Sequence, residues 1–369
     1  MSDLVQLLTP EGVRVADDTY DPWVADVDAD PAALRALYRD LVLVRRFDTE
    51  AVALQRQGEL GLWASLLGQE GAQIGAGRAM LPHDHAFPTY REHGVAWCRG
   101  VDPLDILGLF RGVTLGGWDP RRHGLHLYTI VIGAQALHAT GYAMGVQRDG
   151  AVGTGDPARD TAVLAFFGDG ATSQGDVNEA FIWAGVTNAP VVFFCQNNQW
   201  AISEPLERQT RIPLYRRAHG FGFPGVRVDG NDVLACLAVT RAALARAREG
   251  SGPILVEAFT YRMGAHTTSD DPSRYRVEAE LEQWRLKDPV ERVKAHLLRG
   301  GQVEPDFLAD VEAEADALAE QVRTGCRSLP EPVPGEVFEH VYAALDPDLR
   351  EQRDEIVRLA ALLDEEVPA

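Results

Sequence analysis

The chain has 369 residues, which is long enough for roughly two or three domains and for a core that needs no disulfide or structural metal. Hydrophobic residues make up 46% and charged residues 24% of the sequence, a balance that excludes an intrinsically disordered chain. The formal net charge of −20 argues against nucleic acid or an anionic membrane as the main partner. The four cysteines form no CxxC pair, so neither a zinc site nor a disulfide framework is indicated.

The amino terminus has no basic start and no long apolar run, so it lacks the pattern of a signal peptide. The most apolar run, Val191–Cys195, is too short to cross a bilayer. We therefore expect a cytoplasmic protein without membrane association.

Residues 1–33 are expected to form an N-terminal arm, because residues 1–29 combine turn-forming residues with several aspartates. A helix is predicted to begin at Asp30-Pro31, since Asp can cap a helix and Pro tolerates its first position. The leucines that follow recur with helical spacing.

Residues 34–300 are expected to form one α/β domain. Short apolar runs predict buried strands at 161–167, 190–195 and 253–259, and the stretches between them predict helices near 174–187 and 232–248. Strands that alternate with helices are typical of right-handed crossovers and a mostly parallel sheet. The predicted architecture is therefore a parallel sheet flanked by helices.

Residues 301–369 are expected to form a C-terminal helical extension, because the strand signal ends after about residue 275. Long helices are predicted near 305–326 and 336–363, separated by the stiff segment 328–335. Their polar faces favour a packing arm or an oligomer contact over a separate catalytic domain.

The strongest functional signal is FFGDGATSQGDVNEAFIWAGVTNAPVVFFCQNNQWAIS at residues 166–203. A GDG triplet around Asp169 follows one predicted strand, and an Asn pair ending at Asn198 follows the next. Ligands of parallel sheets bind beyond the carboxyl ends of the strands, so these polar groups should emerge side by side. A carboxylate and an amide oxygen suit Mg²⁺, which completes its octahedron with phosphate and water oxygens. Each short motif is common alone, but the ordered strand–helix–strand unit is much more specific.

This unit resembles the thiamine diphosphate motif, and further blocks narrow the resemblance. In chain order they are LLGQEGAQIGAG (66–77), FPTYREHG (87–94), IVIGAQALHATGYAMG (130–145), VRVDGND (226–232) and FTYRMGAHTTSDDPSRYR (259–276). From about Leu34 to Tyr275, the chain resembles the α subunit of the decarboxylating first component of 2-oxo acid dehydrogenase complexes, of the branched-chain and pyruvate types. The resemblance implies a thiamine diphosphate-binding fold, with thiamine diphosphate and Mg²⁺ as cofactors.

The resemblance also implies a set of site residues. The implied metal ligands are the side chains of Asp169 and Asn198 and the backbone carbonyl of Trp200. The implied cofactor-binding residues are Tyr90, Arg91, Gly170, Ala171, Gln196 and His266 at the diphosphate end, with backbone groups near Ile130 and Ile132 at the aminopyrimidine. The Gln196 contact stays open, because relatives carry Arg or Glu at this position.

His266 is the implied catalytic residue, in a polar loop after a predicted strand. It would hydrogen-bond the cofactor phosphate and donate a proton when the acyl group passes to lipoamide, a task that suits a group with a reference pKa of about 6.5. Thr267, Thr268 and Ser269 occupy a region that is phosphorylated in some relatives, and nothing in the sequence indicates that this chain is regulated in that way. The segment 129–134 lacks the Ser and Thr that bind K⁺ in some relatives, so this ion is not predicted.

The implied function is oxidative decarboxylation of a small 2-oxo acid, with transfer of the acyl group to lipoamide of a dihydrolipoyl acyltransferase core. In the family, a β chain of related fold supplies the glutamate that activates the aminopyrimidine. We therefore expect two α and two β chains, and an isolated α chain that is inactive. The apolar helix near 176–187, which contains Phe181, Ile182 and Trp183, is expected to contribute to the subunit contacts.

The residues favour a branched-chain 2-oxo acid slightly over pyruvate, and acetoin is a third candidate. Two other classes stay open. An NAD-dependent oxidoreductase would need a G-x-G-x-x-G turn after a strand, whereas GTGDPA at 153–158 precedes its strand. A non-catalytic scaffold with a vestigial pocket is disfavoured because Asp169 and Asn198 are both present.

Overall fold

The computed structural model describes residues 4–339 and 341–366. Within these residues, the main sheet has six parallel strands in the order β1-β7-β8-β4-β3-β2. The strands are β1 Leu4–Val5, β2 His85–Phe87, β3 Val163–Gly168, β4 Val191–Asn197, β7 Gly225–Asp229 and β8 Ile254–Phe259. A short antiparallel hairpin, β5 Trp200–Ala201 and β6 Glu204–Pro205, follows β4. The predicted α/β class with a parallel sheet is confirmed.

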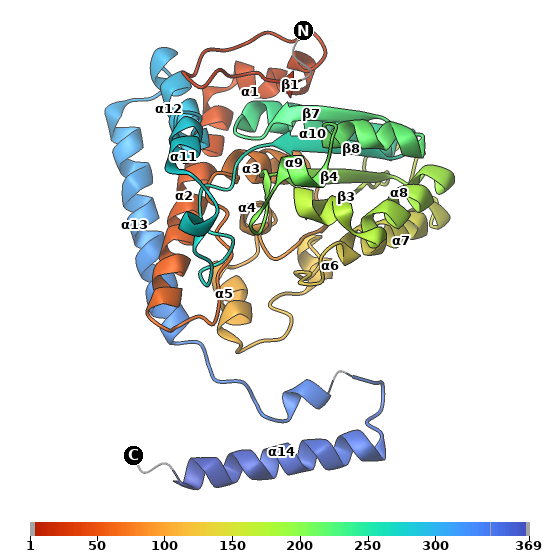
Figure 1. Cartoon of the computed structure of the whole chain (residues 1–369), viewed down its shortest axis with the longest axis vertical. Coiled ribbons are helices and arrows are strands. Elements are labelled where there is room, and N and C mark those ends of the chain that lie inside the picture. Colours follow the sequence, from red (N-terminus) through yellow and green to blue (C-terminus); the bar gives the residue numbers. More distant parts are fainter. Residues whose placement is uncertain (1–3, 340, 367–369) are drawn as a thin grey trace.

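Helices cover both faces of the sheet (Figure 1). On one face lies α10 Val233–Arg248, with α3 Glu70–Ala79 packed against it and with α2 Pro31–Arg56 and α4 His93–Cys98 against α3. On the other face lie α7 Ala134–Arg148 and α8 Gly175–Thr187. The remaining helices are α1 Ala25–Ala29, α5 Pro103–Arg111, α6 Pro120–His123, α9 Leu206–Gln209, α11 Glu278–Arg285, α12 Pro289–Arg299, α13 Pro305–Arg327 and α14 Pro347–Glu366.

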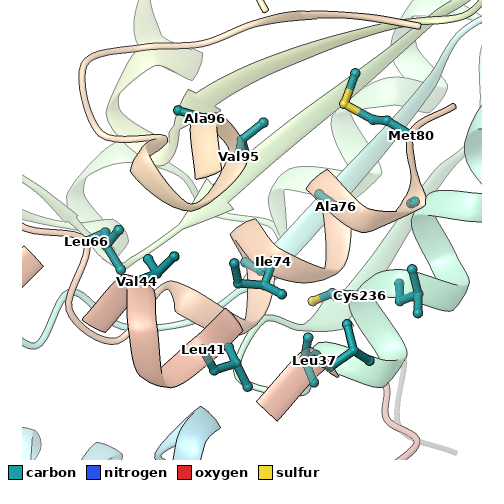
Figure 2. Close-up of a cluster of buried hydrophobic side chains, with 14 of the residues drawn as sticks. Leu37, Leu41, Val44, Leu66, Ile74, Ala76, Met80, Val95, Ala96 and Cys236 are labelled. Atoms are coloured by element: carbon teal, nitrogen blue, oxygen red, sulfur yellow. The ribbon is translucent and has the colours of Figure 1, made fainter. Parts of the chain in front are cut away.

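The strands are buried on both sides because their side chains alternate between two cores. In β3, Phe166 joins the core under α10, whereas Phe167 joins the core under α7 and α8. Figure 2 shows part of the first core, where Leu41 of α2, Ile74 of α3 and Cys236 of α10 lie close together. The sheet is thus held between two helical layers, and its carboxyl edge is positioned from both faces.

Most predicted elements agree with the structure to within two residues. The predicted strands at 161–167, 190–195 and 253–259 correspond to β3, β4 and β8, and the predicted helices near 174–187, 232–248 and 305–326 correspond to α8, α10 and α13. Asp30 caps α2 as expected, because its carboxylate accepts a hydrogen bond from Ala32 N at 2.9 Å. Among the described residues, no helix is both long and apolar enough to cross a membrane.

Two expectations need correction. The N-terminal segment is not simply an extended arm, since β1 pairs with β7 and residues 25–29 form α1. The predicted helix at 336–363 begins only at Pro347, and residue 340 lies outside the described residues. Asp346 directly precedes Pro347, and a residue before proline is disfavoured in helical conformation. Its carboxylate also accepts a hydrogen bond from Leu349 N at 2.9 Å, which caps the helix that begins at the proline. The helix therefore starts at the proline and cannot run through it.

The two C-terminal helices differ in their relation to the body. Helix α13 packs lengthwise along α2, whereas α14 lies apart from the sheet and its helical layers (Figure 1). The division at residues 33 and 300 stays a prediction.

Candidate active site

The carboxyl ends of β3 and β4 bring the two polar motifs together. Gly168 pairs with Gln196 in the parallel register, so the residues that follow the two strands start from neighbouring points. Asp169 and Asn198 both line a cavity of about 440 Å³ at this edge of the sheet. Their adjacency follows directly from the parallel pairing of two consecutive strands.

The same cavity collects all the site residues that the sequence predicted. Its lining includes Asp169, Asn198, Trp200, Tyr90, Arg91, Ile130, Ile132, Gly170, Ala171, Gln196 and His266. It also includes polar residues that sequence reasoning missed, namely Gln69, Glu92, Gln135 and Arg262. Each missed residue lies inside one of the sequence blocks that carried the resemblance, so the blocks held a signal for them, but only the fold shows that they face the cavity.

Asp169 is the buried carboxylate of the site. Its Oδ2 atom accepts a hydrogen bond from Gln209 Nε2 at 2.8 Å. Burial raises the pKa of Asp169 to about 6, against the lowering effect of the Gln209 hydrogen bond. Gly170 follows directly, and a Cβ atom there would lie 2.7 Å from Ala201 Cβ, so only glycine lets the two segments approach this closely.

Asn198 and Trp200 are arranged by a tight turn at the end of β4. Gln199 between them has a left-handed φ of 70°, and Trp200 N donates to Asn198 Oδ1 at 3.2 Å. The Trp200 carbonyl accepts from Arg262 Nη1 at 3.0 Å. Among the described residues, no group of three or more His, Cys, Asp or Glu side chains could hold a metal ion. A cation here would therefore be held by one carboxylate with neutral oxygens, a set that suits Mg²⁺ with ligand or water oxygens.

Two buried guanidinium groups flank His266. Arg91 donates from Nη2 to the His266 carbonyl at 2.7 Å and from Nη1 to the Ser65 carbonyl. Arg262 is fully buried and donates to the Ile202 carbonyl at 2.7 Å. These acceptors are neutral, so the two charges are available to an anion in the cavity, and guanidinium groups match phosphate oxygens.

The surroundings of His266 change the expectation drawn from its reference pKa. Its Nδ1 atom lies 3.3 Å from both Arg91 Nη2 and Arg262 Nη1, which can only donate. Nδ1 is therefore the acceptor, which assigns the ring proton to Nε2. Burial, together with the charges of Arg91 and Arg262, lowers the pKa of His266 to about 3. The imidazole is thus neutral at pH 7 and offers an N–H donor, and an anion bound between the arginines would raise its pKa again.

Tyr90 completes this wall of the cavity. Its ring meets the His266 ring edge to face, with centroids 6.2 Å apart, and the Arg91 guanidinium lies 5.7 Å from its centroid. Tyr90 therefore packs against the polar groups of the site and lies outside the main core.

Gln196, whose contact the sequence left open, bonds to two neighbouring side chains of this chain. Its Nε2 atom donates to Glu92 Oε1 at 2.6 Å, and its Oε1 atom accepts from Gln73 Nε2 at 3.0 Å. Burial raises the pKa of Glu92. Because both ends of the Gln196 amide bond to protein groups, a direct contact with a cofactor stays a prediction.

Several buried polar atoms around the cavity have no hydrogen-bond partner among the described residues. On lining residues they are the donors Gln69 Nε2, Trp200 Nε1 and Arg262 Nε and the acceptor Gln135 Oε1, and Gln209, which bonds to Asp169, adds the acceptor Oε1. Buried polar groups are nearly always paired, so such atoms indicate an expected ligand. Phosphate oxygens of a ligand could accept from the donors, whereas the two acceptors need an N–H or O–H group of a ligand or a water.

Comparison with known proteins agrees with this geometry. Residues 38–333 match the family model described as the dehydrogenase E1 component. The chain is 44% identical over 353 residues to the 3-methyl-2-oxobutanoate dehydrogenase subunit alpha of Mycobacterium tuberculosis, covering 95% of this chain and 93% of the relative. It is 39% identical over 333 residues to the pyruvate dehydrogenase E1 component subunit alpha of Acholeplasma laidlawii, covering 87% and 92%. The corresponding subunit of Bacillus cereus is 32% identical over 352 residues, covering 95% and 91%.

The family match spans most of the chain and ends before α14, and these relatives align over nearly their whole length. The family depends on thiamine diphosphate, and an α subunit implies a β subunit partner. The chain therefore belongs to the dehydrogenase E1 component family, as an α subunit of the 2-oxo acid dehydrogenase type.

Proposed function

We propose that this chain binds thiamine diphosphate and Mg²⁺ in the cavity at the ends of β3 and β4. With a β subunit it catalyses oxidative decarboxylation of a branched-chain 2-oxo acid and passes the acyl group to lipoamide of an acyltransferase core in the cytoplasm. The observation that supports this most strongly is that every site residue implied by the sequence resemblance lines one cavity. The branched-chain substrate is supported by the 44% identical relative, and pyruvate, suggested by the 39% identical relative, is the second candidate.

Different polar residues of the cavity would bind different parts of the cofactor. Asp169, Asn198 and the Trp200 carbonyl supply oxygens for Mg²⁺. Arg91 and Arg262 supply fixed positive charge for the diphosphate, and the Nε2–H of His266 supplies a hydrogen-bond donor. When bound, thiamine diphosphate supplies the carbanion chemistry of decarboxylation, while the protein orients the cofactor and excludes water.

His266 has a second task in this proposal, which is to hold a proton near the acyl group during transfer to lipoamide. If so, His266→Ala should lose overall complex activity more than it loses decarboxylation measured with an artificial electron acceptor. The exposed His219→Ala serves as the control and should retain both activities. Equal losses in both assays would restrict His266 to cofactor binding.

The β subunit is expected to cover exposed apolar side chains at the cavity edge and on α8. Ile130 and Ile132 at its edge are exposed, as are Ile182, Trp183 and Val186 on α8. Phe181 points the other way and is buried in the core, so only part of the predicted apolar helix is available for subunit contacts. Contiguous apolar surface often marks a protein interface, so we propose these side chains as the contact surface for the β subunit.

The test uses purified α and β chains, separately and together, with thiamine diphosphate and Mg²⁺. We expect turnover only from the complex, with a higher kcat/KM for 3-methyl-2-oxobutanoate than for pyruvate. The reverse preference would favour the pyruvate candidate. Sustained turnover by the α chain alone would contradict the division of the site between two subunits.

A further inference from the structure

A largely buried strap, residues 63–66, runs behind the cavity wall and lies outside the cavity lining. It ties together wall segments that are distant in sequence. Arg91 Nη1 donates to the Ser65 carbonyl. Thr268 N donates to the Trp63 carbonyl at 2.9 Å, and Trp63 N donates to Thr268 Oγ1 at 3.1 Å. The strap thus links the turn that carries Arg91 to the loop that carries His266.

His93 joins this strap to a third wall segment. The residue is fully buried at the start of α4, and its ring stacks on the Trp63 ring with centroids 4.2 Å apart. Its Nε2 atom lies 3.0 Å from the Ala64 carbonyl, and its Nδ1 atom lies 2.9 Å from the Tyr128 hydroxyl. Tyr128 directly precedes residues 129–132, which include the predicted contacts to the aminopyrimidine.

The chemistry of the His93 bridge allows one arrangement of protons. The Ala64 carbonyl can only accept, so Nε2 carries the proton, and neutral Nδ1 accepts from the Tyr128 hydroxyl. Burial lowers the pKa of His93 to about 3 and raises the pKa of Tyr128 well above its usual value. Both groups therefore stay neutral, and the bridge persists across the range in which enzymes work.

We propose that His93 and Tyr128 are positioning residues that set the spacing between the diphosphate end of the cavity and segment 129–132. The His93 ring bonds on one side to the strap and on the other to Tyr128, which directly precedes segment 129–132, so it connects the strap to a further segment of the cavity wall. The inference rests on the proposed function, because it assigns the two ends of the cavity to the two ends of thiamine diphosphate.

The test measures the affinities of two ligands for the α–β complex by calorimetry in the presence of Mg²⁺. Thiamine diphosphate should contact both ends of the cavity, whereas inorganic diphosphate should contact only the end near Arg91 and Arg262. Tyr128→Phe removes one hydroxyl and leaves the ring in place. We expect this variant to raise the Kd of thiamine diphosphate about tenfold, the scale of one lost buried hydrogen bond. The Kd of inorganic diphosphate should change by less than about twofold, because this ligand does not reach segment 129–132.

Controls separate positioning from general stability. Tyr142→Phe removes a hydroxyl that lies 3.1 Å from His85 Nε2 outside the cavity, and both affinities should stay at wild-type values. His93→Gln keeps a donor and an acceptor, so it should weaken thiamine diphosphate binding less than His93→Leu. If Tyr128→Phe weakens both ligands equally, or neither, the inference is overturned. If the wild-type complex fails to bind thiamine diphosphate, the proposed function is overturned instead.

Discussion

The buried side of the cavity and its rim are built in different ways. On the buried side, Asp169, Gln196 and Asn198 lie at strand ends, are less than a tenth exposed, and bond to other residues of the same chain. On the rim, which comprises residues 129–132 and Ile202, isoleucines are widely exposed, with 66% for Ile130, 40% for Ile132 and 55% for Ile202.

This difference indicates that the chain forms the buried polar side of the site and leaves the apolar rim exposed. A buried polar group is costly unless it is paired, so the polar side is completed by contacts within this chain and by the ligand that it binds. An exposed apolar rim carries no such requirement and is stabilised when another surface covers it. The contrast supports the proposal that a β subunit covers the exposed rim of this site.

The largest effect is expected on the buried side. Asp169→Ala removes the charged ligand of the proposed metal site and should weaken Mg²⁺-dependent binding of thiamine diphosphate by at least about 1,000-fold, the scale of losing a buried charge contact. Calorimetry on the α–β complex measures this effect. Asp176→Ala, an exposed aspartate at the start of α8, is the matched control and should bind normally. Wild-type affinity in Asp169→Ala would remove this carboxylate from the site.

A second test concerns Asp48, a buried carboxylate that accepts hydrogen bonds from Trp63 Nε1 at 2.8 Å and Ser65 Oγ at 2.6 Å behind the cavity. Burial raises the pKa of Asp48 to about 6, so between about pH 4 and 6 the folded state binds more protons than the unfolded state. This group should therefore lower the free energy of unfolding as the pH rises, by up to about 3 kcal/mol.

Asp48→Asn should remove that slope, which is measured as the difference between variant and wild-type unfolding free energies at pH 4 and pH 7. The exposed Asp348→Asn should keep the wild-type slope. A pH dependence that is unchanged in Asp48→Asn would show that the Asp48 carboxyl titrates as it does in the unfolded chain.

The exposed apolar surface is tested at α8. Trp183 is 48% exposed on this helix, and large aromatic side chains carry much of the binding energy of protein interfaces. Trp183→Ala should weaken α–β association about tenfold or more, because an aromatic anchor contributes about 2 kcal/mol. Analytical ultracentrifugation of the two chains measures the dissociation constant. Leu298→Ala, which alters an exposed leucine on α12, should leave association unchanged. Equal association of Trp183→Ala and wild type would exclude this face of α8 from the interface.

The smallest effect is expected at Ile202, where a β-branched residue has a left-handed φ of 56°. This conformation costs an ordinary residue about 1 kcal/mol, and Ile202, which is 55% exposed, loses little burial in the free α chain when truncated, so Ile202→Gly should stabilise the free α chain by about that amount. Ile212→Gly, at an exposed isoleucine without a left-handed φ, should destabilise it instead. Thermal unfolding compares the two, and a lower Tm for Ile202→Gly would show that the rim needs this side chain.

The central unit of the fold and its polar ends could be predicted from sequence alone. The strands before Asp169 and Asn198 are short apolar runs joined by a helix, a pattern that favours parallel pairing, and β3 and β4 pair in this way. Their carboxyl ends therefore lie side by side, and the adjacency of the two side chains follows from this one strand–helix–strand unit. The start of α14 at Pro347 is also set by local sequence, because a helix rarely includes the residue before a proline, here Asp346.

Properties that depend on contacts between distant segments could not be predicted from local sequence patterns. Gln196 bonds to Gln73 and Glu92, each more than 100 residues away, and no local pattern shows these contacts. The pKa of His266 falls because burial and the charge of Arg91, 175 residues earlier, act on it together. Desolvation and Coulomb energies depend on distance through space and on the exclusion of water, and neither is a property of sequence spacing.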